Sequence, residues 1–292
     1  MPHPQDEPAG AASRHGVVRA LWGSTHPGPT LVVTVLAVAL GIAVGLDAWR
    51  IALLTLAVFA GQLSIGLSND AIDADRDRIT GRADKPIARG DVGVRTAWTV
   101  ATICVAVALL LSAPLGVGML TVHAVTIASA WSYNLGLKRT AFSLAPFLLS
   151  FGLFPSLATL SAPEPSFAAP WATAAGAALG AAVHLTNVLP DLADDARTAV
   201  RGLPHRLGVR TSALLAALAV LAGAVAVLLG PASDTGIPPR AWVFFGLVAA
   251  TATATFMLAL ARPATRTLFR LVMLGALLLA AQLVATGGQL SG

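Results

Sequence analysis

The sequence predicts an all-α integral membrane protein with nine transmembrane helices, and three observations support this fold class. Hydrophobic residues make up 56% of the 292 positions, charged residues only 11%, and the mean hydropathy is +0.76. A typical soluble domain has about 25% charged residues. Apolar runs of about 20 residues, the length that a membrane-spanning helix needs, recur along the chain. The basic residues lie between these runs rather than in a stripe with aromatic side chains, so the formal charge of +5 does not indicate nucleic-acid binding.

The apolar runs divide the chain into a tail and one transmembrane domain. Residues 1–28 are polar, with proline, glycine and histidine, and we expect them to form a flexible cytoplasmic tail. Residues 29–292 are expected to form the transmembrane domain, and Cys104, the single cysteine, excludes a disulfide within the chain. The nine expected spans are 29–47, 50–69, 95–113, 115–134, 142–161, 170–190, 211–230, 241–261 and 267–287.

The basic residues orient these spans. Of the 19 lysines and arginines, 17 lie in the tail or next to the loops that follow the second, fourth, sixth and eighth spans. Only Arg50 and Arg240 lie on the opposite side. Because positively charged loops remain in the cytoplasm, the chain is expected to lie in the cell membrane with a cytoplasmic N-terminus and an external C-terminus.

An acidic cluster follows the second expected span. Asn69, Asp73 and Asp77 repeat every four residues, so on a helix they share one face, and Asp70 borders it. Carboxylates this close repel one another when ionised, and a divalent cation would relieve the repulsion. Oxygen ligands of this kind favour Mg²⁺, which proteins often hold together with substrate phosphates. Solvated loop charges or helix caps are the plainer reading of one such cluster alone.

A second acidic cluster, with Asp191 and Asp195 again four residues apart, follows the sixth span. The two clusters are four spans apart, which suggests two four-helix halves plus a ninth helix. We expect the clusters to face each other across a central cavity, with the active-site mouth at the cytoplasmic side. Two carboxylate clusters rimmed by arginines suit a metal-bound diphosphate, and the membrane setting suggests that it carries a lipid chain.

These motifs resemble those of the UbiA superfamily of intramembrane prenyltransferases. The first motif of that superfamily, N-D-x-x-D-x-x-x-D, is matched by Asn69, Asp70, Asp73 and Asp77. The second, D-x-x-x-D, is matched by Asp191 and Asp195. The resemblance implies that these six residues hold Mg²⁺ on a prenyl diphosphate, with Asp70 in support and the other five as catalytic residues.

The resemblance also implies further contacts. The expected diphosphate-binding residues are Arg82, Lys85, Lys138 and Arg139. The possible acceptor pocket consists of Tyr133, His184 and Asn187. Plainer readings remain open: the basic residues could be positive-inside anchors, Tyr133 an interface residue, and His184 a hydrogen-bonded histidine within the membrane.

The expected function is Mg²⁺-dependent transfer of a prenyl group, within the membrane, from a prenyl diphosphate to a hydrophobic or aromatic small-molecule acceptor, with an aromatic one favoured. The acceptor class follows from the resemblance alone. A terpene cyclase of the same superfamily, or a transferase that uses another lipid or a phosphoribosyl substrate, remains an alternative. A transporter with an acidic cation site is a third reading, although acids at helix ends beside basic loops suit a substrate head group better than a path through the membrane.

Overall fold

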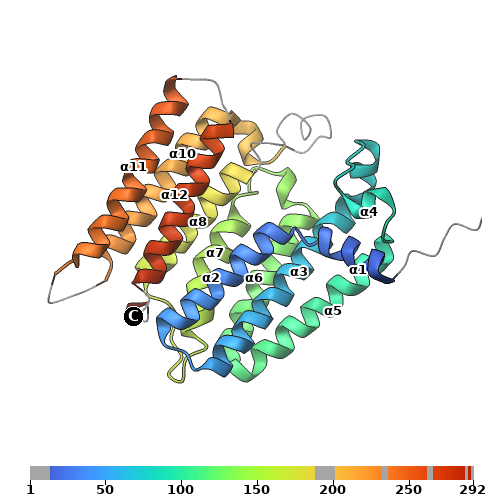
Figure 1. The fold of residues 1–292 in the computed structure, drawn as a ribbon, viewed down its shortest axis with the longest axis horizontal. Coiled ribbons are helices and arrows are strands. Elements are labelled where there is room, and N and C mark those ends of the chain that lie inside the picture. Colours follow the sequence, from blue (N-terminus) through green and yellow to red (C-terminus); the bar gives the residue numbers. More distant parts are fainter. Residues whose placement is uncertain (1–13, 188–200, 232–235, 262–265, 287–288, 291–292) are drawn as a thin grey trace, which may run out of the picture.

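The computed structural model describes residues 14–187, 201–231, 236–261, 266–286 and 289–290, and these residues form helices without a strand element (Figure 1). The helices are α1 (Arg14–Gly23), α2 (Pro27–Val44), α3 (Ala48–Ile79), α4 (Pro86–Arg89), α5 (Val94–Ser112), α6 (Val117–Leu135), α7 (Ala145–Thr159), α8 (Pro170–Asn187), α10 (Leu203–Leu229), α11 (Pro239–Ala261) and α12 (Arg266–Ala285). Two 3₁₀ turns, η1 (Ala113–Leu115) and η2 (Leu137–Arg139), flank α6.

A helix lies in each of the nine ranges expected to span the membrane. Six of the described helices, α2, α3, α5, α10, α11 and α12, are long and apolar enough to cross it. The protein is therefore an all-helical, multi-pass membrane protein. The full count of nine crossings, the division into two repeated halves and the orientation of the termini stay predictions.

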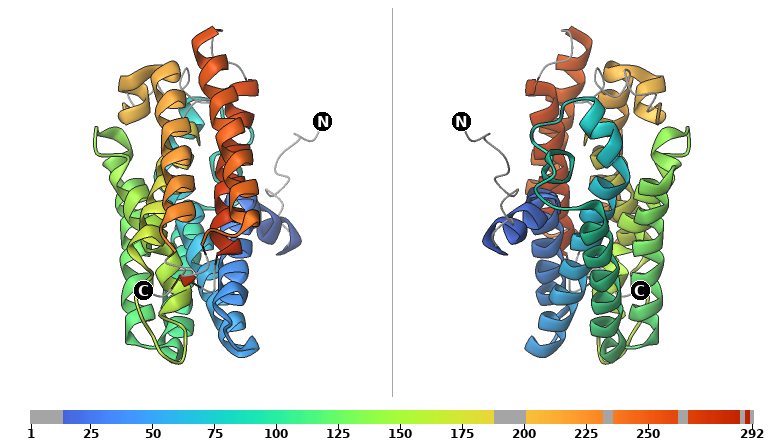
Figure 2. Two further views of the ribbon diagram at one scale, coloured as in Figure 1. Left: turned by 90° about the vertical axis from the view of Figure 1, so that its left-hand side faces the viewer. Right: turned by 90° about the vertical axis from the view of Figure 1, so that its right-hand side faces the viewer.

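The long helices run side by side in one bundle (Figure 2). In the first part of the chain α3 packs against α2 and α5, and in the second part α8 packs against α7 and α10. Small residues permit the close approach of α8 to α7. A methyl group added at Gly176 or Gly180 would overlap the backbone of α7, because the carbonyl oxygens of Phe151 and Phe147 lie against these positions.

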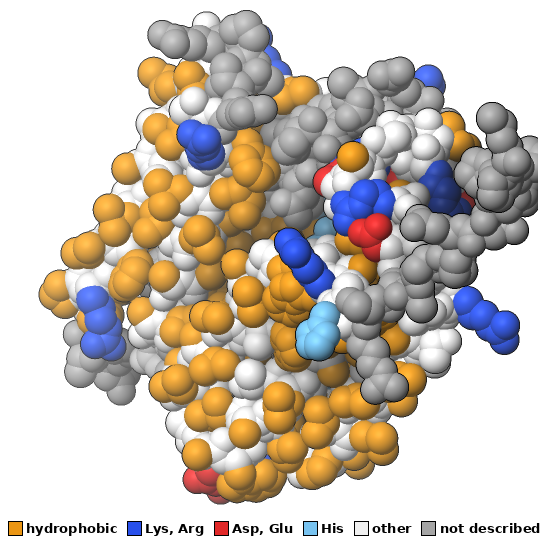
Figure 3. Space-filling model, turned by 45° about the vertical axis from the view of Figure 1, so that its right-hand side comes forward, with side chains coloured by type: hydrophobic (Ala, Val, Ile, Leu, Met, Phe, Trp, Pro, Cys, Tyr) orange, Lys and Arg blue, Asp and Glu red, His pale blue; other side chains and the backbone are white. Residues whose placement is uncertain are grey.

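The surface of the bundle is mostly apolar. Hydrophobic side chains are spread over much of the face drawn in Figure 3, and charged side chains are most numerous in its upper right part. Large apolar side chains are exposed on several helices, among them Val35, Leu110 and Val243. A soluble monomer rarely exposes contiguous apolar patches of this extent, whereas lipid tails cover such a surface in a membrane.

Helix α3 continues past the expected end of its span at residue 69, and it ends only at Thr80 and Gly81, where Gly81 adopts a positive φ of 68°. Its 32 residues make it about 48 Å long, against about 30 Å for the hydrocarbon core. Asp70 lies about 33 Å from the start of the helix. The acidic cluster therefore lies on the part of α3 that exceeds the hydrocarbon thickness.

Part of the expected tail also forms regular structure. Residues 14–23 form α1, and α2 begins at Pro27, directly after a short elbow. On one face of α1, Ala20 packs in a small apolar cluster with Ile87 of α4. Helix α1 therefore lies against the loop that carries Lys85. The domain boundary at residue 29 stays a prediction.

Candidate functional site

Three of the predicted acidic residues lie on one buried face of α3. The residues Asp70, Asp73 and Asp77 are each between 2% and 4% exposed. Their spacing of three and four residues places them on adjacent turns of one helical face. The neighbouring Asp75 points to the opposite side, where its side chain is 91% exposed and pairs with Arg78. The helix therefore separates a buried acidic face from a solvated one.

Asp73 has two cationic partners in this cluster. The ammonium group of Lys138, in η2, donates to both carboxylate oxygens of Asp73 at 2.7 Å. A guanidinium nitrogen of Arg76 donates to Oδ2 of Asp73 at 3.0 Å. Burial lowers the pKa of Lys138, and the carboxylate of Asp73 opposes this shift. A loop after α6 thus supplies the counter-charge for an acid on α3.

Asp70 is held through one of its two oxygens. Its Oδ1 accepts from Lys85 Nζ at 2.7 Å and lies 2.8 Å from Nε2 of His26. Its Oδ2 is buried and has no hydrogen-bond partner among the described residues. A buried carboxylate oxygen without a partner is costly, so this atom is the clearest candidate metal ligand in the cluster.

The remaining members of the first motif have weaker or neutral contacts. Asp77 accepts from Arg76 at 3.3 Å. The amide nitrogen of Asn69 donates to Oδ1 of Asn134 at 3.1 Å. Asn134, in α6, in turn donates to the hydroxyl of Ser68 at 2.9 Å. These bonds join α3 and α6 beside the acidic face.

The chemistry of this donor set fits Mg²⁺. Asp70, Asp73 and Asp77 offer carboxylate oxygens and Asn69 offers an amide oxygen, and Oδ2 of Asp70 has no partner within the described ranges. In the part of the chain that the structure describes, no three His, Cys, Asp or Glu side chains are already arranged to hold a metal ion. The predicted ligands on the opposite wall, Asp191 and Asp195, lie outside the described residues.

The four predicted diphosphate contacts divide into two groups. Lys85 and Lys138 both reach the acidic face, as described above. Arg82 instead pairs with Asp84 through two hydrogen bonds of 2.9 Å, which hold the pKa of Asp84 at about 2. Arg139 is exposed to solvent beside Lys138. The structure therefore brings the two lysines to Asp70 and Asp73.

Two of the three predicted acceptor-pocket residues lie together. The ring centroids of Tyr133 and His184 are 5.8 Å apart, and Phe147 contacts both rings at 5.1 and 4.7 Å. Nε2 of His184 lies 3.0 Å from the hydroxyl of Ser143, whereas Nδ1 has no partner in the part of the chain that the structure describes. Asn187, the last residue of α8, is exposed. Rings from α6, α7 and α8 therefore form one aromatic group.

Three residues that complete the cluster were not predicted from the sequence, namely His26, Arg76 and Asn134. Arg76 lies within the first motif, three residues after Asp73, and this helical spacing could have identified it. No spacing signal connects His26 or Asn134 with α3, because they are 44 and 65 residues away from their partners.

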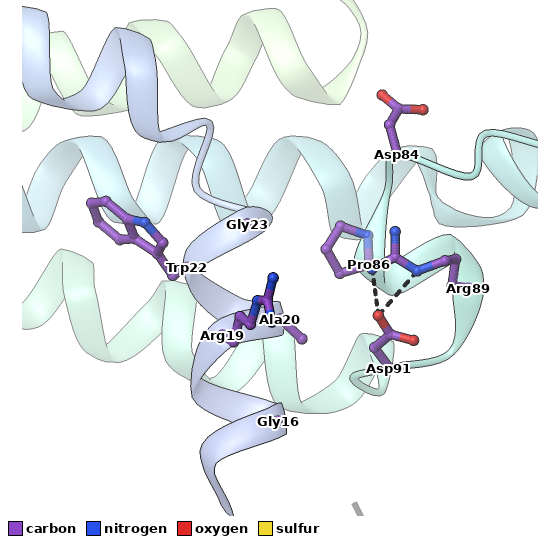
Figure 4. Close-up of a pocket in the computed structure, with 9 residues that line it drawn as sticks. All are labelled: Gly16, Arg19, Ala20, Trp22, Gly23, Asp84, Pro86, Arg89 and Asp91. Carbon is purple, nitrogen blue, oxygen red and sulfur yellow. Dashed lines mark hydrogen bonds and ion pairs between the residues drawn. The ribbon is translucent and has the colours of Figure 1, made fainter.

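A pocket of about 640 Å³ lies next to this site, between α1 and the α4 segment (Figure 4). Figure 4 shows Arg19 and Trp22 on α1 and the Arg89–Asp91 pair on the other wall. None of these residues belongs to the predicted site. The pocket reaches the predicted site only through Asp84 and Pro86, the two neighbours of Lys85.

Comparisons with known proteins agree with the resemblance noted in the sequence. The model of the UbiA prenyltransferase family matches residues 30–278. A search of curated proteins finds no match.

Several solved structures share the fold. A structure described for digeranylgeranylglyceryl phosphate synthase aligns with a TM-score of 0.70 and 13% identity over 94% of this chain and 99% of that chain. A UbiA homologue from Archaeoglobus fulgidus, bound to GPP and Mg²⁺, aligns at 0.68 and 16% over 91% and 99%. The apo UbiA homologue from Aeropyrum pernix K1 aligns at 0.67 and 18% over 92% and 98%.

Proposed function

The chain belongs to the UbiA prenyltransferase family, and from that premise we propose that it transfers a prenyl group from a prenyl diphosphate to an aromatic acceptor within the membrane. The related protein from Archaeoglobus fulgidus has been solved with GPP and Mg²⁺ and with DMAPP and Mg²⁺. These ligands support a prenyl diphosphate as the donor here. The acceptor class rests on the family resemblance.

The main support for the proposal is the pairing of opposite charges on the buried face of α3. Three buried carboxylates meet three cationic side chains, Lys85, Lys138 and Arg76. A metal-bound diphosphate supplies both kinds of charge, so it can take both kinds of partner. The carboxylates would turn to the metal, and the two lysines would turn to the diphosphate oxygens.

In this proposal Asn69, Asp73 and Asp77 hold metal from one wall, and Asp70 supports them through its free oxygen. Asp191 and Asp195 supply ligands from the other wall. Bound Mg²⁺ would neutralise the diphosphate and so favour its departure. Lys85 and Lys138 would stabilise the same developing negative charge, in an environment where burial strengthens electrostatic effects. Arg82 and Arg139 would neutralise the diphosphate from the rim.

The reaction balances without a covalent enzyme intermediate. The allylic C–O bond breaks and its electron pair leaves with the diphosphate. The acceptor carbon then bonds to the allylic carbon and loses a proton. The aromatic group of Tyr133, Phe147 and His184 would shelter the allylic cation and orient the acceptor. His184, whose Nδ1 has no partner among the described residues, would take the proton, and Asn187 would contact the acceptor at the end of α8.

The site would open to the cytoplasm. This orientation is inferred from the sequence, because 17 of the 19 basic residues belong to the tail or to the segments around the loops after the even-numbered expected spans, where the acidic clusters also occur.

The experiment measures diphosphate release by the purified protein in detergent. Donors from C10 to C20 and longer would be supplied with Mg²⁺, with and without a mixture of aromatic acceptors. Asp73→Ala should abolish release. Asp75→Ala is the matched control, because Asp75 lies on the same helix but faces solvent. Full activity of the Asp73→Ala protein would refute the proposal.

The same assay separates the alternatives. Release that requires both Mg²⁺ and an acceptor supports a transferase. Release without an acceptor, with a cyclic product by mass, would make the protein a terpene cyclase. No release with any prenyl donor would direct the search to phosphoribosyl or other lipid substrates.

A further inference from the structure

His26 lies at the elbow between α1 and α2, in an uncommon backbone conformation. Its φ of 55° and ψ of 69° place it in the left-handed region, and it is the one residue other than glycine with positive φ among the described residues. Histidine tolerates this region better than most residues do, although less well than glycine. A residue held in such a conformation indicates that the surrounding structure fixes it in place.

The elbow is pressed against α3 one turn before Asp70. The carbonyl group of Thr25 lies against Gly66, and a methyl group at Gly66 would overlap it. The same carbonyl oxygen accepts from the hydroxyl of Thr30 at 2.8 Å. The backbone contact at Gly66 thus fixes the position of the next residue, His26, relative to α3.

We propose that His26 is a positioning residue of the acidic site, which holds Oδ1 of Asp70 so that Oδ2 faces the metal. This inference rests on the proposed function. Nε2 of His26 is 2.8 Å from Oδ1, and the histidine side chain is 38% exposed while that of Asp70 is 1% exposed. The orphaned oxygen of Asp70 is the one that His26 does not touch.

His26 also matters because Lys85 has two alternative partners in the proposed function, namely Asp70 and the diphosphate. Nζ of Lys85 lies 2.7 Å from Oδ1 of Asp70 and 3.2 Å from Nε2 of His26, so both side chains converge on one oxygen. The proposed function requires Lys85 to turn to the diphosphate. When it does so, His26 keeps its contact with Asp70, and the carboxylate does not lose its orientation. The elbow of the N-terminal segment thereby becomes part of the metal site.

Two substitutions at this position separate the side chain from the backbone. In His26→Asn the residue tolerates a positive φ well, but its amide is too short to reach Asp70. In His26→Gln the amide nitrogen can reach the position of Nε2, but glutamine adopts a positive φ less readily than asparagine does. A positioning role predicts that glutamine restores function better than asparagine. A purely backbone role predicts the reverse order.

The readout is Mn²⁺ binding to the full-length protein in detergent, without donor, followed by electron paramagnetic resonance. Loss of a residue that orients a metal ligand typically weakens metal affinity about 10- to 100-fold. Lys85 still holds Asp70 when no diphosphate is present, so we expect about 10-fold weaker binding for His26→Asn. His26→Gln should bind within about threefold of the wild type. Equal binding by all three proteins, or weaker binding by the glutamine variant than by the asparagine variant, would overturn the proposal.

Two further variants make the result decisive. Asp73→Ala tests the metal site itself: if it binds Mn²⁺ like the wild type, the proposed function fails, whatever His26 does. If it loses binding while His26→Asn does not, only the role of His26 fails. Should His26→Asn fold poorly, Asp70→Asn is compared with and without His26→Gln. With no carboxylate to hold, a change at His26 should then have no further effect on affinity, and an additional loss would overturn the proposal.

Discussion

Replacing Lys138 by methionine removes the cation that is buried against Asp73. Both side chains are 5% exposed, and the ammonium group donates to both carboxylate oxygens at 2.7 Å. Breaking such a pair by removing one partner typically costs about 3 to 5 kcal/mol, because the other charge stays buried. Arg76 still reaches Asp73 at 3.0 Å. We therefore expect a loss near the lower limit, about 3 kcal/mol of unfolding free energy.

The uncompensated charge of Asp73, rather than a loss of packing, should account for this loss of unfolding free energy. Methionine keeps most of the apolar stem of lysine, and Asp73→Asn in the same protein removes the uncompensated charge. The double variant should therefore regain much of the lost stability, with a coupling of about 1 to 3 kcal/mol in a double-mutant cycle. Unfolding would be followed by helical circular dichroism in detergent.

The chain offers a matched control for this cycle in the exposed pair of Arg78 and Asp75. These residues are also a cation and an aspartate in contact, with side chains 43% and 91% exposed. A cycle on Arg78→Met and Asp75→Asn should give less than about 1 kcal/mol, as exposed pairs do. If Lys138→Met unfolds like the wild type, or if its coupling is no larger than that of the control pair, the charge-matching argument is wrong.

Two further predictions concern the loops around the site. Gly66→Ala should destabilise the protein by about 1 to 3 kcal/mol, because the added methyl group overlaps the carbonyl of Thr25, whereas Gly28→Ala, with open space around it, should have a much smaller effect in the same thermal unfolding assay. Asp84 has a pKa lowered from 3.8 to about 2, so its pairing with Arg82 stabilises the loop above pH 3.8 and is lost as the pH falls toward 2. The rate of hydrogen exchange in loop residues 80–85, corrected for its intrinsic pH dependence, should therefore increase only below about pH 4. In Asp84→Asn this increase should be absent.

Hydropathy located the helices but not all of their ends. The second expected span stops at residue 69, where polar residues begin, yet α3 continues to Ile79. The apolar pattern reports the extent of the hydrocarbon core, whereas a helix ends where its backbone hydrogen bonding ends. In α3 that point is marked by Gly81 and not by the aspartates, whose charges are matched by nearby cations.

The motif spacing predicted the acidic face, but the rest of the site depends on tertiary contacts. Four-residue spacing places Asp73 and Asp77 on one face of any helix, so the sequence alone suffices there. Lys85 and Lys138 were indicated by the family resemblance, which carries information about the fold that local spacing lacks. His26 and Asn134 carry no such signal, because their roles depend on how α2 and α6 approach α3. Helix α1 is short and was obscured by the polar residues around it.

The partners of the buried acids also set an order in which the site can be assembled during synthesis. Lys138 follows Asp73 by 65 residues. At about 5 to 20 residues per second, it leaves the ribosome about 3 to 13 s later. Throughout that interval Arg76, on the same helix, is the nearest cation that the nascent chain can offer to Asp73. The buried pair of Asp73 and Lys138 can therefore form only after α5, α6 and the loop that follows them have been synthesised. Until then we expect the acidic end of α3 to stay hydrated.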